Sequence, residues 1–234
     1  MRSALAAITI SLTCIMGSYA IAADTDAGTL ARGGRLYDRW YEEAKAETPT
    51  GNHVSWPASN SQHSGEDTFR CKSCHGWDLL GKDGAYATGS WATGIKGVNG
   101  MAGKDPAAIV AVLKDAKHGF GGAMPDADLM ALAVFVSKGR IDMDPYIDRA
   151  TKKAKGDVAA GARIYETACA ICHGANGKGV KDADHLGVIS NENPWETIHK
   201  ISFGPPGEQM PAFLVFGPKV AGDLLAYLQT LPNE

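Results

Sequence analysis

Two short stretches decide the fold of this chain: Cys71-Lys72-Ser73-Cys74-His75 and Cys169-Ala170-Ile171-Cys172-His173. Each has the form Cys-x-x-Cys-His, and each is followed by a glycine. The two-residue gap places both thiols on one side of a turn, where they can add to the vinyl groups of a haem as thioethers. The adjacent histidine then lies under the porphyrin as the proximal iron ligand. The repeated pattern predicts two covalent haem groups, with His75 and His173 on the irons.

Two other chemistries use the same cysteine spacing. A structural zinc site needs four ligands, and the two motifs together offer four thiolates, but each motif stands inside its own repeat. A thioredoxin-type dithiol pair needs a strand–helix–strand context, which the sequence lacks. The fifth cysteine, Cys14, lies in the N-terminal apolar stretch, so no thiol outside the motifs is expected to form a disulfide or bind an iron.

The N-terminus has the features of a bacterial secretory signal peptide. Arg2 supplies the positive charge, residues 4–15 are apolar but short for a membrane span, and Ala20-Ile21-Ala22 is a small-residue cleavage site. We therefore expect residues 1–22 to be removed and the mature chain to be periplasmic, with no membrane span. An uncleaved anchor is the alternative; a lipoprotein modified at Cys14 is disfavoured by the residues before it.

The mature chain is mildly acidic. Without residues 1–22 it carries 22 basic and 26 acidic side chains. Nucleic-acid partners select strongly basic surfaces, so no nucleic acid is expected as a partner.

The sequence around the motifs repeats, with 98 residues between Cys71 and Cys169. A short Gly-to-Tyr helix precedes each motif, at 34–37 and 161–165, and a Gly-rich loop follows it. Apolar stripes at 129–136 and 220–231 have helical spacing, Asp105-Pro106 begins a helix through Leu113 that closes near Gly119, and no strand pattern is present. The prediction is an all-α chain with two tandem domains, 23–145 and 156–234, joined by a linker at 146–155, each wrapped around one haem. The first domain carries an insert at about 41–70, expected to be a surface loop.

The ligand opposite each histidine sets the function of a haem, because methionine gives a closed centre with a raised potential and an open site allows ligand chemistry. Met124 and Met210 each end a Gly-rich loop directly before a proline, at what look like matching places in the repeat. They are the predicted axial ligands. Competitors exist for the first haem only: Met101, His53, His63 and His118. In the second half, His185 and His199 look incidental.

These features together resemble the tandem class I c-type cytochromes, over nearly the whole mature chain and most strongly over 156–234. The resemblance implies an all-α fold in which N- and C-terminal helices cross near the haem, and one haem edge is open for electron transfer. It also implies redox-protein partners, with a dehydrogenase or quinol-oxidising complex as donor and an oxidase or reductase as acceptor. The first half departs from the pattern, because 49 residues separate His75 from Met124 but only 37 separate His173 from Met210.

The expected role is therefore single-electron transfer rather than catalysis. Dihaem thiosulfate dehydrogenases resemble this layout, but one of their haems has a cysteine ligand, and no spare cysteine is present here. Dihaem peroxidases are longer and need an open haem. A cytochrome subunit held by a larger dehydrogenase complex is the third alternative.

Overall fold

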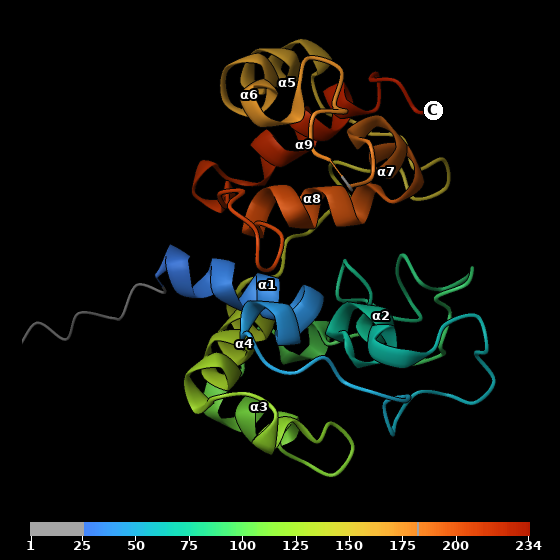
Figure 1. The fold of residues 1–234 in the computed structure, drawn as a ribbon, viewed down its shortest axis with the longest axis vertical. Helices are drawn as coiled ribbons and strands as arrows, with labels where there is room; N and C mark the ends of the chain where they lie inside the picture. Colours follow the sequence, from blue (N-terminus) through green and yellow to red (C-terminus); the bar gives the residue numbers. More distant parts are fainter. Residues whose placement is uncertain (1–25, 182) are drawn as a thin grey trace, which may run out of the picture.

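The computed structural model describes residues 26–181 and 183–234. The predicted signal peptide and the first residues of the mature chain lie outside the described residues. The described part is mostly helical and contains no strand, only two isolated bridges, between residues 81 and 96 and between 147 and 154. The expectation of a helical chain is confirmed. Helices α1 to α4 gather in one half of the view and α5 to α9 in the other (Figure 1).

The first half is built on two helices that cross, α1 (Ala27–Glu43) and α4 (Asp126–Lys138). They approach closely at Gly33, where a Cβ atom would meet the carbonyl oxygen of Ala131. A side chain at this point would push the two helices apart. The remaining elements of this half are η1 (Gly65–Phe69), α2 (Cys71–His75), η2 (Asn99–Met101), α3 (Pro106–Leu113) and η3 (Phe120–Gly122).

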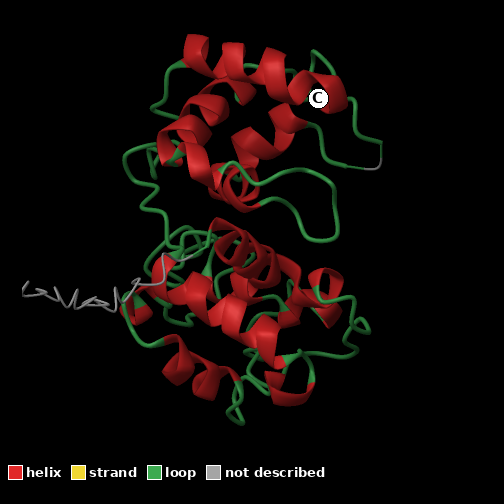
Figure 2. Cartoon of the chain, turned by 90° about the vertical axis from the view of Figure 1, so that its left-hand side faces the viewer, coloured by secondary structure: helices red, strands yellow, loops and turns green. Residues whose placement is uncertain are grey.

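The second half repeats this crossing with α5 (Val158–Ile164) and α9 (Pro218–Leu228). Gly161 takes the place of Gly33, and its missing Cβ would meet the carbonyl oxygen of Asp223. Between these helices lie the π-helical turn η4 (Tyr165–Cys169), α6 (Ala170–His173), α7 (Leu186–Glu192), α8 (Pro194–Phe203) and the 3-10 turn η5 (Leu214–Phe216). Figure 2 shows that loops join the helices throughout.

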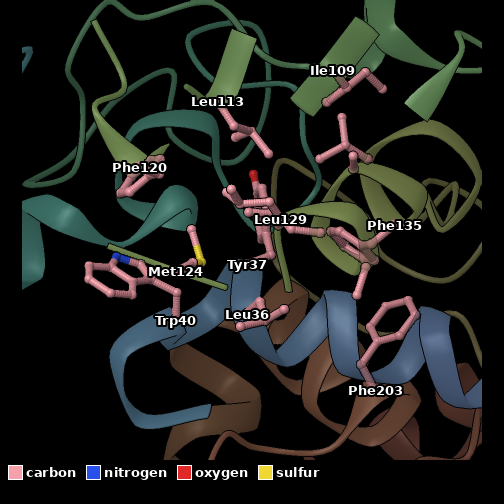
Figure 3. Close-up of a cluster of buried hydrophobic side chains, with 14 of the residues drawn as sticks. Leu36, Tyr37, Trp40, Ile109, Leu113, Phe120, Met124, Leu129, Phe135 and Phe203 are labelled. Atoms are coloured by element: carbon pink, nitrogen blue, oxygen red, sulfur yellow. The ribbon is translucent and has the colours of Figure 1, made fainter. Parts of the chain in front are cut away.

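Two apolar clusters stabilise these helices. The first cluster gathers the inner faces of α1, α3 and α4, and includes Tyr37, Trp40, Met124 and Phe135 (Figure 3). The second surrounds α8 and α9. Each cluster also takes residues from the other half of the chain: Phe203 of α8 packs in the first, and Trp77 packs in the second. The two halves therefore bury apolar surface against each other.

The helix boundaries follow most of the sequence signals. The Asp105 side chain accepts a hydrogen bond of 3.0 Å from the Ala107 amide, as an N-cap residue does. The helix it begins ends at Leu113, however, six residues before the predicted end near Gly119. The Lys114 amide still bonds to the Val110 carbonyl, but the next amide, of Asp115, bonds to Val112 only three residues back, so the α-helical pattern stops there. In the same way α9 ends at Leu228, before the last leucine of the apolar stripe.

Two segments outside the main helices are anchored by side chains. In the predicted insert, the Ser55 hydroxyl donates a hydrogen bond of 2.7 Å to the Lys117 carbonyl, so the segment packs over the loop that precedes α4. In the predicted linker, Ile147 is 1% exposed and belongs to the second apolar cluster. Both segments therefore contribute to packing.

Candidate haem sites

The first motif forms the short helix α2, which places its two cysteines three residues apart on one side of a turn. Both thiols are free and partly exposed. Burial raises the pKa of Cys71 to about 12 and that of Cys74 to about 11, so both are protonated at neutral pH. Two reduced cysteines on one side of a turn are what the two thioether bonds to a haem require.

His75 is held in a defined tautomer. Its Nδ1 lies 2.8 Å from the Lys96 carbonyl oxygen, which can only accept, so Nδ1 carries the hydrogen. The lone pair is therefore on Nε2, and burial lowers the pKa of the ring, which keeps it neutral. A backbone carbonyl on the second nitrogen is the usual support of a metal-binding histidine. The loop can approach this closely because position 97 is glycine, where a Cβ would overlap the Leu79 carbonyl.

The second motif lies in η4 and α6 and is more open. Cys169 is partly buried and Cys172 is exposed, and both are free thiols. Burial raises the pKa of Cys169 and lowers the pKa of His173. Ile171, between the two cysteines, is 90% exposed.

The backbone after each motif is fixed by the same two contacts. The Tyr37 hydroxyl donates to the Gly76 carbonyl at 2.7 Å, and the Tyr165 hydroxyl donates to the Gly174 carbonyl at 2.6 Å. Each glycine has a positive φ, 77° and 69°, a region that favours glycine. Five residues after these glycines, the amides of Gly81 and Gly179 donate to the carbonyls of the motif histidines, both at 2.8 Å.

The ring contacts of the two tyrosines repeat as well. Tyr37 packs against Phe135 of α4, and Tyr165 packs against Tyr227 of α9. Both pairs have ring centres 5.2 Å apart and planes inclined by 48°. The tyrosine thus links each helix crossing to the glycine that follows each motif.

The two predicted axial methionines lie in different surroundings. Met124 is 5% exposed and packs among the side chains of the first apolar cluster (Figure 3). Met210 is partly buried and packs against the second cluster. Their assignment as iron ligands remains a prediction.

The three histidines that could bind the iron of the first haem in place of Met124 differ in their contacts. His53 has both ring nitrogens engaged, with the His118 carbonyl at 3.1 Å and the Ser55 amide at 3.1 Å. His63 stacks on Trp91 with ring centres 3.3 Å apart. His118 alone of these three forms a ring pair with His75, with ring centres 6.4 Å apart.

One histidine that the sequence analysis set aside is part of the contact between the halves. His199 of α8 is fully buried, and its Nε2 donates to the Gly34 carbonyl of α1 at 2.9 Å. Its ring lies 5.0 Å from that of Trp77, which directly follows the first motif and its glycine. No local signal marks this role, because it depends on packing across 165 residues of sequence.

The donor set around the motifs fits a haem better than a bare metal ion. Among residues 26–181 and 183–234, no group of three or more His, Cys, Asp or Glu side chains could hold a metal ion. Each motif instead offers two thiols and one imidazole, and His75 has a free Nε2 nitrogen as well. A zinc site shared between the motifs is therefore excluded for the described residues.

The comparisons with known proteins agree with this donor set. Residues 156–228 match the family model "Cytochrome C oxidase, cbb3-type, subunit III". A cytochrome c-553-like protein of Synechocystis sp. is 33% identical over 105 residues, which cover 44% of this chain and 92% of that protein. The chain therefore belongs to the cytochrome c family. It contains a cytochrome c electron-transfer domain, whose cofactor is haem c with its iron.

Two solved structures are more distant. One is a reducing HAO-like protein complex of Kuenenia stuttgartiensis, with a TM-score of 0.32, 14% identity, and coverage of 70% of this chain and 92% of that one. The other is a thiosulfate dehydrogenase of Marichromatium purpuratum, with a TM-score of 0.23, 16% identity, and coverage of 91% and 48%. In the described part of this chain, no helix has the length and apolar character of a membrane span.

Proposed function

We propose that this chain is an exported dihaem c-type cytochrome that passes single electrons between periplasmic or membrane-bound redox proteins. One haem is attached at Cys71 and Cys74, and the other at Cys169 and Cys172. The carrying observation is that both motifs are held by the same contacts: a tyrosine hydroxyl on the following glycine, and a glycine amide on the histidine carbonyl. Such agreement between remote parts of one chain supports two sites of one kind.

The same repetition supports two tandem domains, 23–145 and 156–234, joined by 146–155. Each would have its own crossing of a first and a last helix, at Gly33 and at Gly161. The family match over 156–228 falls inside the second of these units.

In this proposal His75 and His173 each provide one iron ligand through Nε2. The hydrogen bond from His75 Nδ1 to the Lys96 carbonyl orients the ring and makes its Nε2 atom a more basic ligand for iron. Met210 would be the other protein ligand of the iron in the second haem, and either Met124 or His118 would be that in the first. A bound haem supplies an iron that cycles between the ferric and ferrous states. Ligands on both faces exclude external molecules, which suits a carrier.

The partners follow from this role. A dehydrogenase or a quinol-oxidising complex would donate electrons, and an oxidase or a reductase would accept them. Export by the predicted signal peptide at residues 1–22 places the chain where c-type cytochromes of bacteria are matured.

The test is a count of covalent haems on the exported full-length chain, by intact mass. The expected result is two haem additions, one of which is lost in the C71A/C74A double variant and the other in C169A/C172A. A chain with a single haem, or with none, would contradict the dihaem proposal. Spectra with and without carbon monoxide separate a carrier from an enzyme, because a carrier with two closed haems does not bind the gas.

A further inference from the structure

Resting on the proposed haem attachment at Cys71 and Cys74, we propose that the sixth ligand of the first haem is His118 and that Met124 is a core residue. The first centre would then have two histidine ligands, while the second has histidine and methionine.

The two helix crossings allow the first half of the chain to be aligned with the second. Gly33 meets Ala131 of α4, and Gly161 meets Asp223 of α9. Helix α4 begins five residues before Ala131, and α9 begins five residues before Asp223, so the two helices align without a gap.

In this alignment the residue equivalent to Met210 is His118. Met210 lies eight residues before the start of α9, and His118 lies eight residues before the start of α4. A 3-10 turn follows each of them, η3 two residues after His118 and η5 four residues after Met210. Met124 lies only two residues before α4 and aligns with Phe216. When the helix starts are used as the reference, the two Met-Pro pairs therefore do not occupy equivalent positions.

The distance between the rings of His75 and His118 fits a shared metal. Their centres are 6.4 Å apart and their planes are inclined by 23°. A metal ion that binds two imidazoles holds each nitrogen at about 2 Å, so the nitrogens lie about 4 Å apart and the ring centres about 6 Å apart.

Both rings also present the same free nitrogen. The Nδ1 of His118 lies 3.0 Å from the Asp115 carboxylate, which accepts, so Nδ1 carries the hydrogen. The Nε2 atoms of His75 and His118 have no hydrogen-bond partner among the residues described. A carboxylate on one histidine and a backbone carbonyl on the other are the two usual supports of metal-binding imidazoles.

The segment 41–70 gives the His118 loop a fixed position. His53 donates from Nε2 to the His118 carbonyl at 3.1 Å, and Ser55 donates to the neighbouring Lys117 carbonyl at 2.7 Å. The second half has no such segment before its motif. The insert thus positions His118, the proposed ligand that has no counterpart of the same residue type in the second half.

The assignment of the sixth ligand can be tested on the exported full-length chain with its haems attached. The readout is the weak far-red absorption band that a methionine ligand gives to ferric haem, together with carbon monoxide binding. We expect the wild type to show a band of one-haem intensity. The band should vanish in M210L and keep its intensity in M124L, a change that conserves side-chain volume.

A second variant tests His118 directly. In H118A the first haem should lose its sixth ligand, bind carbon monoxide and return to the closed state when free imidazole is added. A matched substitution, H185A, should leave the spectra unchanged, because His185 lies in the other half and its ring nitrogen contacts the Glu234 carbonyl.

The outcomes separate the two proposals. A wild-type band of two-haem intensity that M124L halves would overturn the His118 assignment while the haem proposal stands. So would an H118A spectrum identical to that of the wild type. Absence of haem on Cys71 and Cys74, seen by mass, would overturn the dihaem proposal and the ligand assignment with it.

Discussion

The substitution R70M should cost this chain more stability than a change at any ordinary surface arginine. Arg70 immediately precedes the first motif, and its Nη2 pairs with the Asp38 carboxylate of α1. The Asp38 side chain is only 2% exposed and that of Arg70 is 8% exposed. The Arg70 Nε also donates to the Asp38 carbonyl at 3.0 Å. The pair therefore fixes the entry to α2 against the helix that carries Tyr37.

The size of the loss follows from the burial. Removing one partner of a buried pair leaves an uncompensated charge in the interior, which costs about 3–5 kcal/mol. Whole domains are stable by about 5–15 kcal/mol, so the loss is a large fraction. Replacing both partners by apolar or neutral groups should recover much of it, because no buried charge is then left alone. We expect D38N/R70M to be less destabilised than the sum of D38N and R70M by at least about 2 kcal/mol.

Urea unfolding followed by far-UV circular dichroism measures these free energies. K114M is the matched control, since the Lys114–Asp126 pair lies in the same half but has side chains 39% and 84% exposed. An exposed pair contributes about 0–1 kcal/mol. A loss below about 1 kcal/mol in R70M, or strict additivity in the double variant, would refute the reasoning.

Three further outcomes can be measured on the same chain. Burial raises the pKa of Asp38, but Arg70, Lys200 and His199 together outweigh it, and the pKa is lowered below its usual 3.8. The contribution of the ionised Asp38 to stability is therefore complete above that pH and is lost as the pH falls through the folded value. Acid unfolding curves of D38N should lack this dependence. Y165F removes a buried hydroxyl from a carbonyl at 2.6 Å and should lower the free energy of unfolding by about 0.5–1.5 kcal/mol, and an unchanged urea midpoint would contradict this. G33A places a Cβ against the Ala131 carbonyl and should destabilise by about 1–3 kcal/mol, whereas a rise in the thermal midpoint would show that the crossing can relax.

The parts of this fold that the sequence predicts are those with a local cause. The two motifs specify their chemistry by spacing alone, and Asp105 marks the start of α3 because an N-cap residue acts within its own turn. Tyr37 and Tyr165 could be recognised as equivalent positions of the repeat because each lies in a short segment before its motif. Their contact with the glycine carbonyls could not, since for Tyr37 it joins residues 39 apart.

Residue types alone do not distinguish Met124 from His118 as the proposed ligand of the first haem. Two Met-Pro pairs in Gly-rich loops look equivalent when only residue types are compared. Their distances from the following helix differ, eight residues in one half and two in the other, and this becomes visible only when the helix starts are known. The support for the His75 ring could not be predicted either, because the acceptor is the backbone of residue 96, whose side chain carries no signal.

Hydropathy predicts the wrong environment for both middle residues of the first motif and for one of the two in the second. In the first motif these are polar, Lys72 and Ser73, yet they are 4% and 0% exposed; in the second, the apolar Ile171 is 90% exposed. Packing within the first half explains why Lys72 is covered: the loop after the first motif lies against α2, and the Lys72 ammonium lies 3.9 Å from the centre of the Trp91 ring. Burial lowers the pKa of Lys72 to about 7. If each motif carries a haem, the turn that attaches the first is covered by protein at Lys72 and Ser73, and the turn that attaches the second is open to solvent at Ile171.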